Sequence, residues 1–399
     1  MKRKVTDTVE AVQNLREINQ EVFLEALAGY IRRFLTMSFQ KAIELELTEF
    51  LGYQPYERGV SKNNSRNGHY RRSLVTRFGV LKGISVARDR QDDFEPKILR
   101  RYQRREDKIN QQVMALFIGG ISTRRMKTIT RMLVGRGYSA GTISNINKQL
   151  TADMKAWLTA PIEDDIVYVF LDGLNLPVRR FTVSKESLLM AIGISRDGRR
   201  RVLGVQLGDR ESAASWRECL KDLKSRGFKG SCLELGIMDG LPGLEEAFSE
   251  VFPRAKIQRC IVHKLRNIAA KLPRSIQKDC LSGVKRIFYA VSQEEARKRF
   301  QDWKEQWSKI TPGAVECLEK DLEVVLTFYL FPKEHWIRIR TTNIIERAFK
   351  EFRRRTRAMD SFPNEECCLR CVYAISQELD ERWSQYQIKK FITIKKPAA

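Results

Sequence analysis

The stretch IVYVFLDGLNL, residues 166–176, decides how the middle of this chain folds. Its first six residues, Ile166 to Leu171, are apolar or aromatic and predict a buried strand, which stops at an acid, Asp172. The pattern returns in CLELGIMDGLPG, residues 232–243, where Met238 leads directly into Asp239. A glycine follows each aspartate. Two carboxylates placed at the ends of two apolar strands need a physical reason.

The segments around this stretch predict a mixed sheet. ESLLMAIGIS (186–195), RRVLGVQLG (200–208) and AKIQRC (255–260) have the apolar and β-branched composition of strands. AASWRECLKDLKSRG (213–227) and GLEEAFSEVF (243–252) have helical periodicity. Three sequential strands followed by helix, strand, helix and strand are the order expected of an α/β, ribonuclease H-like core.

The sequence after this core predicts an interruption. We expect the first part of the core at 156–267, an all-helical insertion at 268–335, a core helix at 336–362, and a C-terminal helix and tail at 363–399. The insertion includes SQEEARKRFQDWKEQWSKI, which has helical spacing and no strand pattern.

The sequence before the core predicts three regions. Residues 1–52 are helical, 53–105 hold a basic β-hairpin, and 106–155 resemble a helix-turn-helix. In the hairpin, Arg71 and Arg72 either bind phosphates or belong to a solvated basic loop. In the third region Ser139 is a suitable N-cap for a helix. The outward side chains of this helix are Thr142, Asn145 and Lys148. They either read DNA in a groove or belong to a helical hairpin of an ordinary protein core.

Charge indicates the kind of partner. The 399 residues include 73 Lys and Arg against 49 Asp and Glu, a net charge of +24, which favours a polyanion such as nucleic acid. No apolar run approaches the ~20 residues of a membrane span, so we expect no membrane partner and a location in the cytoplasm, at the nucleoid. The eight cysteines are scattered, and we expect no disulfide.

Acids at neighbouring strand ends meet at one edge of a sheet, where a divalent cation relieves their repulsion. A pair of Mg²⁺ ions held this way suits phosphoryl transfer. As third acid we choose Glu346, in the first turn of the helix RTTNIIERAFKEFRRRTRAM. Each acid also has a structural explanation: Asp172 and Asp239 as Asp-Gly turns that bond local amides, and Glu346 as the partner of Asn343 in a capping box.

Other side chains are candidates for contact with DNA. In QRCIVHKLRN, Cys260 and His263 have the spacing of half a zinc site, but the chain offers too few further ligands. His263 either contacts the scissile phosphate or is a packed structural histidine. Trp303 and Trp307 either stack on an unpaired base or pack in a core. Basic residues complete the set of expected DNA contacts: Arg266, Arg347, Lys350, Arg353 and Arg354.

Taken in order, several segments resemble the Mutator-type transposase family of bacterial insertion sequences. They include LDGLNLPVRR, AIGISRDGRRRVLG, ESAASWRECLKDLKSRG, MDGLPGLEEAF, FPRAKIQRCIVHKLRN and TTNIIERAFKEFRRRT, and upstream RNGHYRR, FEPKILRRYQRR and GISTRRM. One departure is Asn175, where the family usually has a bulky residue; it bears on substrate positioning.

The resemblance implies an Asp-Asp-Glu triad carried by Asp172, Asp239 and Glu346, two Mg²⁺ or Mn²⁺ ions, and a Cys-x-x-His signature at Cys260 and His263. It implies binding to double-stranded terminal inverted repeats and target DNA, 3′-end cleavage, strand transfer, and a homodimer or larger assembly. Two alternatives stay open: a structure-selective nuclease of the same fold, and a catalytically silent DNA-binding regulator.

Overall fold

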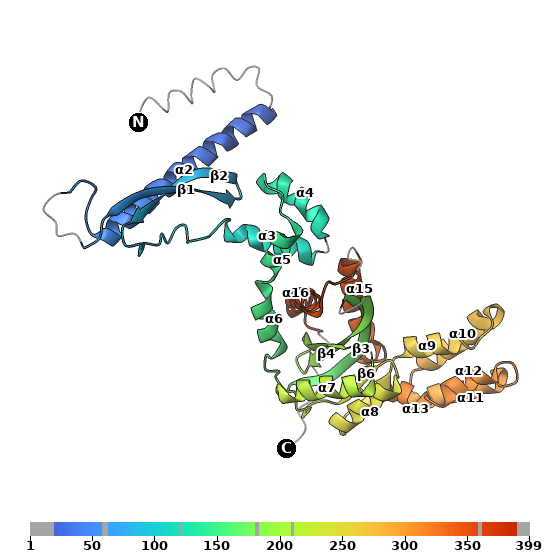
Figure 1. The fold of residues 1–399 in the computed structure, drawn as a ribbon. Helices are drawn as coiled ribbons and strands as arrows, with labels where there is room; N and C mark the ends of the chain where they lie inside the picture. The colour runs from blue at the N-terminus through green and yellow to red at the C-terminus, as the bar shows by residue number, and fades with distance from the viewer. Residues whose placement is uncertain are drawn as a thin grey trace. The chain divides into compact units, whose positions relative to one another are not determined.

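The computed structural model describes residues 20–57, 63–119, 121–179, 183–208, 211–357 and 361–388. The chain forms two compact units, residues 1–148 and 149–399 (Figure 1). Each unit has its own apolar core. The predicted 106–155 region is divided between them.

A long helix and a hairpin form the core of the first unit. Helix α2 (Gln20–Leu51) lies against strands β1 (Arg66–Thr76) and β2 (Gly79–Asp89), which pair antiparallel and confirm the predicted hairpin. Ile43 and Leu47 of α2 are buried against the hairpin. The earlier turns of α2 leave large apolar side chains exposed, among them Leu24 and Phe34.

Three short helices complete this unit: α3 (Asp107–Ile118), α4 (Thr123–Val134) and α5 (Ala140–Asn147). The Ser139 side chain accepts a hydrogen bond from the Thr142 backbone N–H, which confirms the predicted cap. Ile143 and Ile146 are buried on the inner face of α5. Helix α5 ends at Asn147, so Leu150 belongs to the next helix, α6 (Leu150–Leu158), in the second unit.

The second unit contains a five-stranded mixed sheet in the order β5-β4-β3-β6-β7. Its strands are β3 (Ile166–Arg179), β4 (Val183–Ser195), β5 (Arg200–Gly208), β6 (Leu235–Met238) and β7 (Lys256–Arg259). The first three form an antiparallel meander, and β6 and β7 run parallel to β3. The predicted mixed sheet is therefore confirmed.

One strand is longer than the sequence suggests. β3 continues seven residues past Asp172, because its antiparallel pairing with β4 extends from Asp172 opposite Met190 to Arg179 opposite Val183. The expectation that the strand ends at Asp172 is wrong. Asp172 stands inside β3, at the level where the short parallel strand β6 stops.

Helices cover both faces of the sheet (Figure 1). Helices α7 (Ala213–Ser225) and α8 (Pro242–Val251) pack on one face through a cluster that includes Trp216 and Phe248. The other face is covered by α15 (Asn343–Thr356) and α16 (Glu365–Ser384). The face of α15 that packs on the sheet is apolar, and its Ile345, Phe349 and Phe352 are all buried.

Residues 268–335, all of them described, contain helices and no strand, as predicted. The helical segments from β7 to α15 are α9 (Ile261–Ala269), α10 (Arg274–Phe288), α11 (Gln293–Trp307), α12 (Pro312–Glu319), α13 (Leu322–Val325), the 3-10 turn η2 (Thr327–Leu330) and α14 (Trp336–Ile339). All eight cysteines are free thiols. Among the described helices, none has both the length and the apolar character to span a bilayer.

Candidate active site

Asp172 and Asp239 lie side by side in the sheet register. β3 and β6 pair from Tyr168 opposite Leu235 to Phe170 opposite Ile237. Continuing this parallel register by two residues puts Asp239 level with Asp172. The two carboxylates therefore lie next to each other at the same end of the sheet, as the strand pattern predicts.

Each aspartate also bonds one local amide. Asp172 Oδ1 accepts the Gly173 N–H at 2.9 Å, and Asp239 Oδ1 accepts the Leu241 N–H at 3.0 Å. The turn-forming explanation therefore holds for part of each carboxylate. It does not account for their position next to each other.

The environment of Asp172 disfavours its charge. The pKa of Asp172 is raised to about 7, mainly by burial; His263 lowers this pKa, and the charges of Asp239 and Glu211 raise it. Four titratable side chains from four segments thus act on one another. Negative charge is concentrated at this sheet edge.

His263 reaches the same place from the first turn of α9. The strand before it is tied to the sheet, because the Cys260 N–H donates to the Met238 carbonyl at 2.8 Å. The Cys260 thiol raises the pKa of His263, burial opposes this, and the charges of Asp172 and Asp239 add to the rise. Nδ1 of His263 is buried and has no hydrogen-bond partner among the described groups.

Glu346 faces this histidine. Its Oε1 lies 3.6 Å from His263 Nε2 and 3.4 Å from Arg266 Nη1. The capping-box explanation is wrong, because the N-cap residue of α15 is Thr342 and not Asn343, which is already helical. Thr342 donates its backbone N–H and its hydroxyl to the Cys260 sulfur, each at 3.3 Å. Cys260 thereby connects the helix of His263 to the helix of Glu346.

Sequence reasoning missed Glu211. Its carboxylate accepts the Trp216 indole N–H at 3.0 Å and packs over Gly173. Burial raises the pKa of Glu211, the Trp216 bond lowers it, and Asp239 raises it. The order of the strands could have indicated this residue. Because β3, β4 and β5 form an antiparallel meander, β5 runs parallel to β3, and an acid soon after β5 lies at the same end of the sheet as Asp172 and Asp239.

The donor set suits a hard divalent cation. Carboxylate oxygens are the ligands that Mg²⁺ and Mn²⁺ prefer. Burial is the main cause of the raised pKa of Asp172, and the neighbouring carboxylates Asp239 and Glu211 add to it. Within the described part of the chain, however, no three His, Cys, Asp or Glu side chains already form a group able to hold a metal ion. Glu346 is turned toward His263 and Arg266.

The predicted DNA contacts of the second unit are mostly exposed. Arg266 borders the acids, and α15 presents Arg347, Lys350, Arg353 and Arg354 outward. Arg354 pairs with Glu351 on its own helix. Asn175 is exposed on β3 and accepts a hydrogen bond from the Ser187 hydroxyl at 2.8 Å.

The predicted contacts of the first unit differ in accessibility. Arg71, Asn145 and Lys148 are exposed, while Thr142 shares a hydrogen bond with the Ser139 hydroxyl. Arg72 is half-buried and donates to two backbone carbonyls.

Trp303 and Trp307 lie in the core of the insertion. Both side chains are buried, and the Trp303 indole N–H donates to the Cys280 carbonyl at 3.1 Å. A Cβ at Gly283 would come within 2.5 Å of the Trp303 ring. The base-stacking interpretation is corrected for both residues, because neither ring is open to a base.

The fold and the site define an α/β protein with an acidic centre at one end of a mixed sheet, on a strongly basic chain. The family model for "Transposase, Mutator family" matches residues 6–386. The chain therefore belongs to the Mutator family of transposases, and the resemblance expected from its sequence is confirmed.

Relatives in that family are transposases of insertion sequences. The chain is 37% identical over 356 residues to the transposase of ISRM5 from Rhizobium meliloti, with 89% of each chain covered. It is 36% identical to the transposase of IS905 from Lactococcus lactis, covering 91% of this chain and 92% of the relative. A solved Drosophila P element transposase strand transfer complex matches 71% of this chain and 83% of that chain at 10% identity, with a TM-score of 0.29.

Proposed function

We propose that this transposase binds the terminal inverted repeats of an insertion sequence, cleaves the 3′ ends with a divalent metal, and joins them to target DNA. Family membership supports the reaction class. The strand order, an antiparallel meander followed by two parallel strands, supports a ribonuclease H-like core. The net charge of +24 supports DNA as the partner.

One observation supports the proposal: four segments distant in sequence bring Asp172, Asp239, His263 and Glu346 together at one end of the sheet. A protein that only binds DNA has no need to concentrate carboxylates next to a polyanion, since they repel phosphate. Asp172, Asp239 and Glu346 are the residues that would hold two Mg²⁺ or Mn²⁺ ions. Such ions, when bound, activate the attacking oxygen and stabilise the leaving oxygen.

The neighbouring cationic side chains position the substrate. Arg266 is exposed beside Glu346, so its remaining N–H groups can donate to phosphate oxygens at the rim of the site. The raised pKa of His263 favours its charged form, which attracts the same phosphate. Exposed Arg347 and Lys350 lie further along α15 and extend this positive surface.

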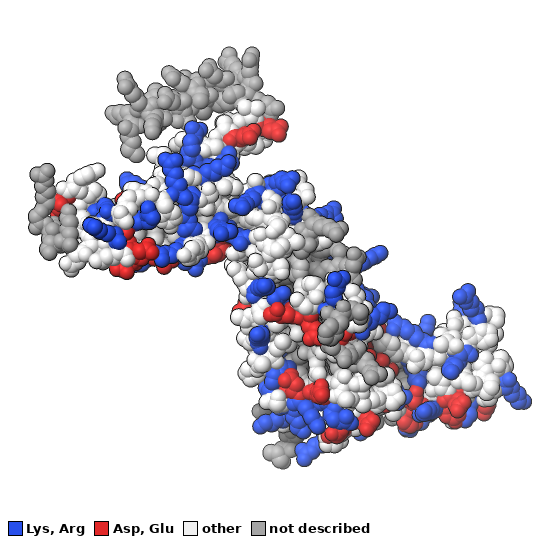
Figure 2. All heavy atoms as spheres, viewed as in Figure 1, with Lys and Arg blue, Asp and Glu red and all other residues white. Residues whose placement is uncertain are grey.

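Other parts of the chain are assigned to holding DNA. Lys and Arg side chains gather over the α2 and hairpin region of the first unit (Figure 2). The groove-reading candidates are exposed Asn145 of α5 and Lys148 at its C-cap, since Ile143 and Ile146 of the same helix are buried. Joining requires two element ends in one complex, so the active species is a homodimer or larger.

Asp172→Asn tests the proposal. The substrate is a labelled duplex that carries the inverted repeats flanking the coding region, in Mn²⁺ buffer. We expect the variant not to cut this duplex, and to bind it with an affinity within about twofold of the wild type. Asp165→Asn is the matched control, since Asp165 precedes the same strand and pairs with Arg201 instead. Retained cleavage by Asp172→Asn overturns the assignment of this acid.

The products of the wild-type chain separate the alternatives. Cut and joined products support a transposase. Cut products without joining indicate a nuclease, and a gel shift without cutting indicates a regulator; either result overturns the proposed function.

A further inference from the structure

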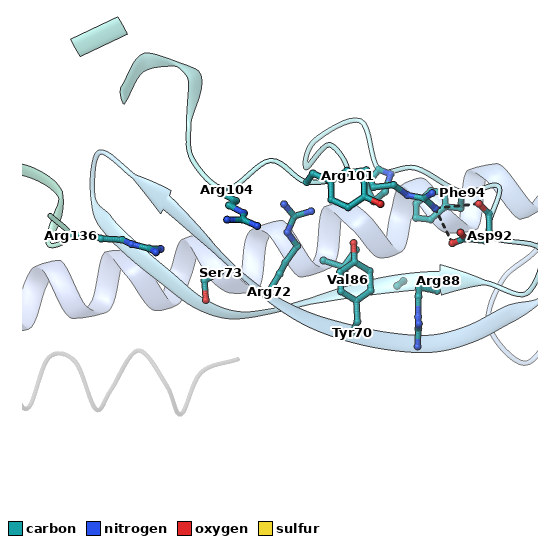
Figure 3. A pocket seen from close by; sticks show the side chains of 13 residues that line it. Tyr70, Arg72, Ser73, Val86, Arg88, Asp92, Phe94, Arg101, Arg104 and Arg136 are labelled. Carbon is teal, nitrogen blue, oxygen red and sulfur yellow. Dashed lines mark hydrogen bonds and ion pairs between the residues drawn. The ribbon is translucent and has the colours of Figure 1, made fainter. Parts of the chain in front are cut away.

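A hollow of about 730 Å³ lies within the first unit. Strands β1 and β2 form its floor, and the segment after β2 and the loop after α4 form its sides. Figure 3 shows Arg72, Arg104 and Arg136 reaching it from three separate segments. Its size is that of a site for a small organic group.

The hollow carries uncompensated positive charge. Five arginines line it, and Arg101 is paired with Asp92 at 2.8 Å. Among the described residues, no carboxylate lies within ion-pairing distance of Arg88, Arg104 or Arg136. An anion is therefore the ligand that this lining favours.

The segment on one side, Arg100 to Arg105, is held in place. Arg72 donates one hydrogen bond to the Arg100 carbonyl at 3.1 Å and another to the Gln103 carbonyl. The Val75 N–H donates to the Arg104 carbonyl, and the Glu106 N–H donates to the Val75 carbonyl. The sequence-predicted phosphate contact Arg72 thus fixes this segment to β1.

Tyr102, at the centre of the fixed segment, has an unusual conformation. Its φ is +63°, in the left-handed region that bulky residues avoid, and its side chain is 85% exposed. Such a backbone is strained and persists where the surroundings enforce it, typically at functional sites. Tyr102 also lines a second hollow of about 340 Å³, together with Arg101 and Arg104.

A second aromatic ring belongs to the same hollow. Tyr70 of β1 is partly exposed, and the Arg88 guanidinium lies 5.7 Å from its ring centroid. Exposed rings together with unpaired arginines match the two halves of a nucleotide, because the rings offer stacking faces and the arginines bind phosphate.

We propose that this hollow binds a nucleotide of DNA whose base has left the double helix, stacked on Tyr102, with its phosphate held by Arg104 and Arg136. A paired base keeps both faces inside the stack, so an exposed tyrosine gains little from intact duplex. The inference rests on the proposed function in taking DNA as the polyanion, and adds a preference for unpaired DNA in the first unit.

The test compares two probes with the full-length protein: a fluorescein-labelled 20-nucleotide oligo(dT) and a 20-base-pair duplex, titrated by anisotropy in EDTA at one salt concentration. Tyr102→Ala should weaken oligo(dT) binding about 5- to 150-fold, the usual contribution of one stacked base. Duplex binding should change less than about twofold. Tyr102→Phe keeps the ring and should match the wild type.

Tyr56→Ala is the matched control, since Tyr56 belongs to the same unit, has φ +65° and is 99% exposed, but lies outside the hollow. It should leave both probes unaffected. Arg104→Ala should weaken both probes, because both present phosphates.

Three results overturn the proposal: wild-type protein that does not bind oligo(dT), equal losses on both probes for Tyr102→Ala, or no loss on either. If Tyr102→Ala unfolds the unit, Tyr102→Leu, which retains bulk without an aromatic face, takes its place under the same criteria. None of these results depends on cleavage, so failure here is distinguishable from failure of the proposed reaction.

Discussion

The two Asp-Gly pairs at the sheet edge use glycine for different reasons. At Gly240 the backbone φ is +92°, a conformation that residues with a Cβ rarely adopt. At Gly173 the backbone is an ordinary strand, but a Cβ would come within 2.6 Å of Glu211 Oε2. The first glycine makes a turn, and the second gives a neighbouring carboxylate room.

Gly173→Ala should therefore push the Glu211 carboxylate aside and destabilise the second unit by about 1 kcal/mol, the low end for overpacking, because the atoms it meets end a flexible side chain. The added methyl group and Glu211 compete for the same space, so Glu211→Ala should relieve much of that loss. Urea unfolding of the two single variants and the double variant measures this coupling.

Gly313→Ala is the control for the substitution itself, because nothing lies within 4 Å of the added Cβ and the φ there is not left-handed. It should leave stability within about 0.5 kcal/mol of the wild type. Strictly additive losses for Gly173→Ala and Glu211→Ala would show that the two side chains do not compete.

At the scale of elements, the sequence indicates strands and helices well where periodicity is strong, and misjudges their ends. Asp172 looked like a strand end because a charge interrupts an apolar run, yet pairing with β4 carries β3 on to Arg179. Glu211 is harder to predict than Asp172 because it lies three residues beyond the end of β5 and not directly after an apolar run, so only the direction of β5 relative to β3 indicates it. The choice between stacking and core packing for Trp303 depends on Gly283 and Cys280 of another helix, which the local pattern does not reveal.

The contact between α16 and β5 makes stability depend on pH. Asp380 Oδ1 accepts the Val202 N–H at 2.8 Å. Burial raises the pKa of Asp380 to about 7, although the Val202 bond and Arg201 oppose the rise. The folded chain then keeps a proton that the unfolded chain releases, so this carboxyl costs stability as pH rises from about 4 to about 7.

Asp380→Asn stays neutral and keeps an acceptor for Val202. We expect it to be more stable than the wild type by about 1–2 kcal/mol at pH 8 and equal to it near pH 4. Thermal unfolding of both proteins across this range provides the measurement.

Asp197 gives the opposite sign. Burial alone would raise the pKa of Asp197, but the Ser195 hydroxyl and Arg199 hold this pKa below its ordinary value. Its charge therefore stabilises the folded chain at neutral pH. Asp197→Asn should be less stable than the wild type at neutral pH and equal to it in acid. A pH-independent gain for Asp380→Asn would rule out the titration of this carboxyl as the cause.

At the scale of the whole molecule, the division into two units could not be placed from the sequence. Helices α5 and α6 are separated by two residues and have similar helical patterns. What assigns α6 to the second unit is its packing on α16, where Arg370 donates to the Thr151 hydroxyl at 3.0 Å and the rings of Trp157 and Tyr373 lie 5.5 Å apart. Both partners of α6 come more than 200 residues later in the chain.

The net charge of +24 leads to the last prediction, on salt. Each phosphate that a basic side chain neutralises releases about one counterion, so a protein contacting 6 to 10 phosphates loses about 10³- to 10⁵-fold in affinity between 50 and 200 mM salt. We expect duplex binding by the full chain to fall within that range.

Arg104→Ala should reduce the slope of log K against log salt by about one, because Arg104 has no carboxylate partner among the described residues and is free to contact phosphate. Asp172→Asn should leave the slope unchanged, since it removes an acid and no phosphate contact. Anisotropy titrations at four salt concentrations give all three slopes, and a wild-type slope near zero would mean that the excess of Lys and Arg is not what binds DNA.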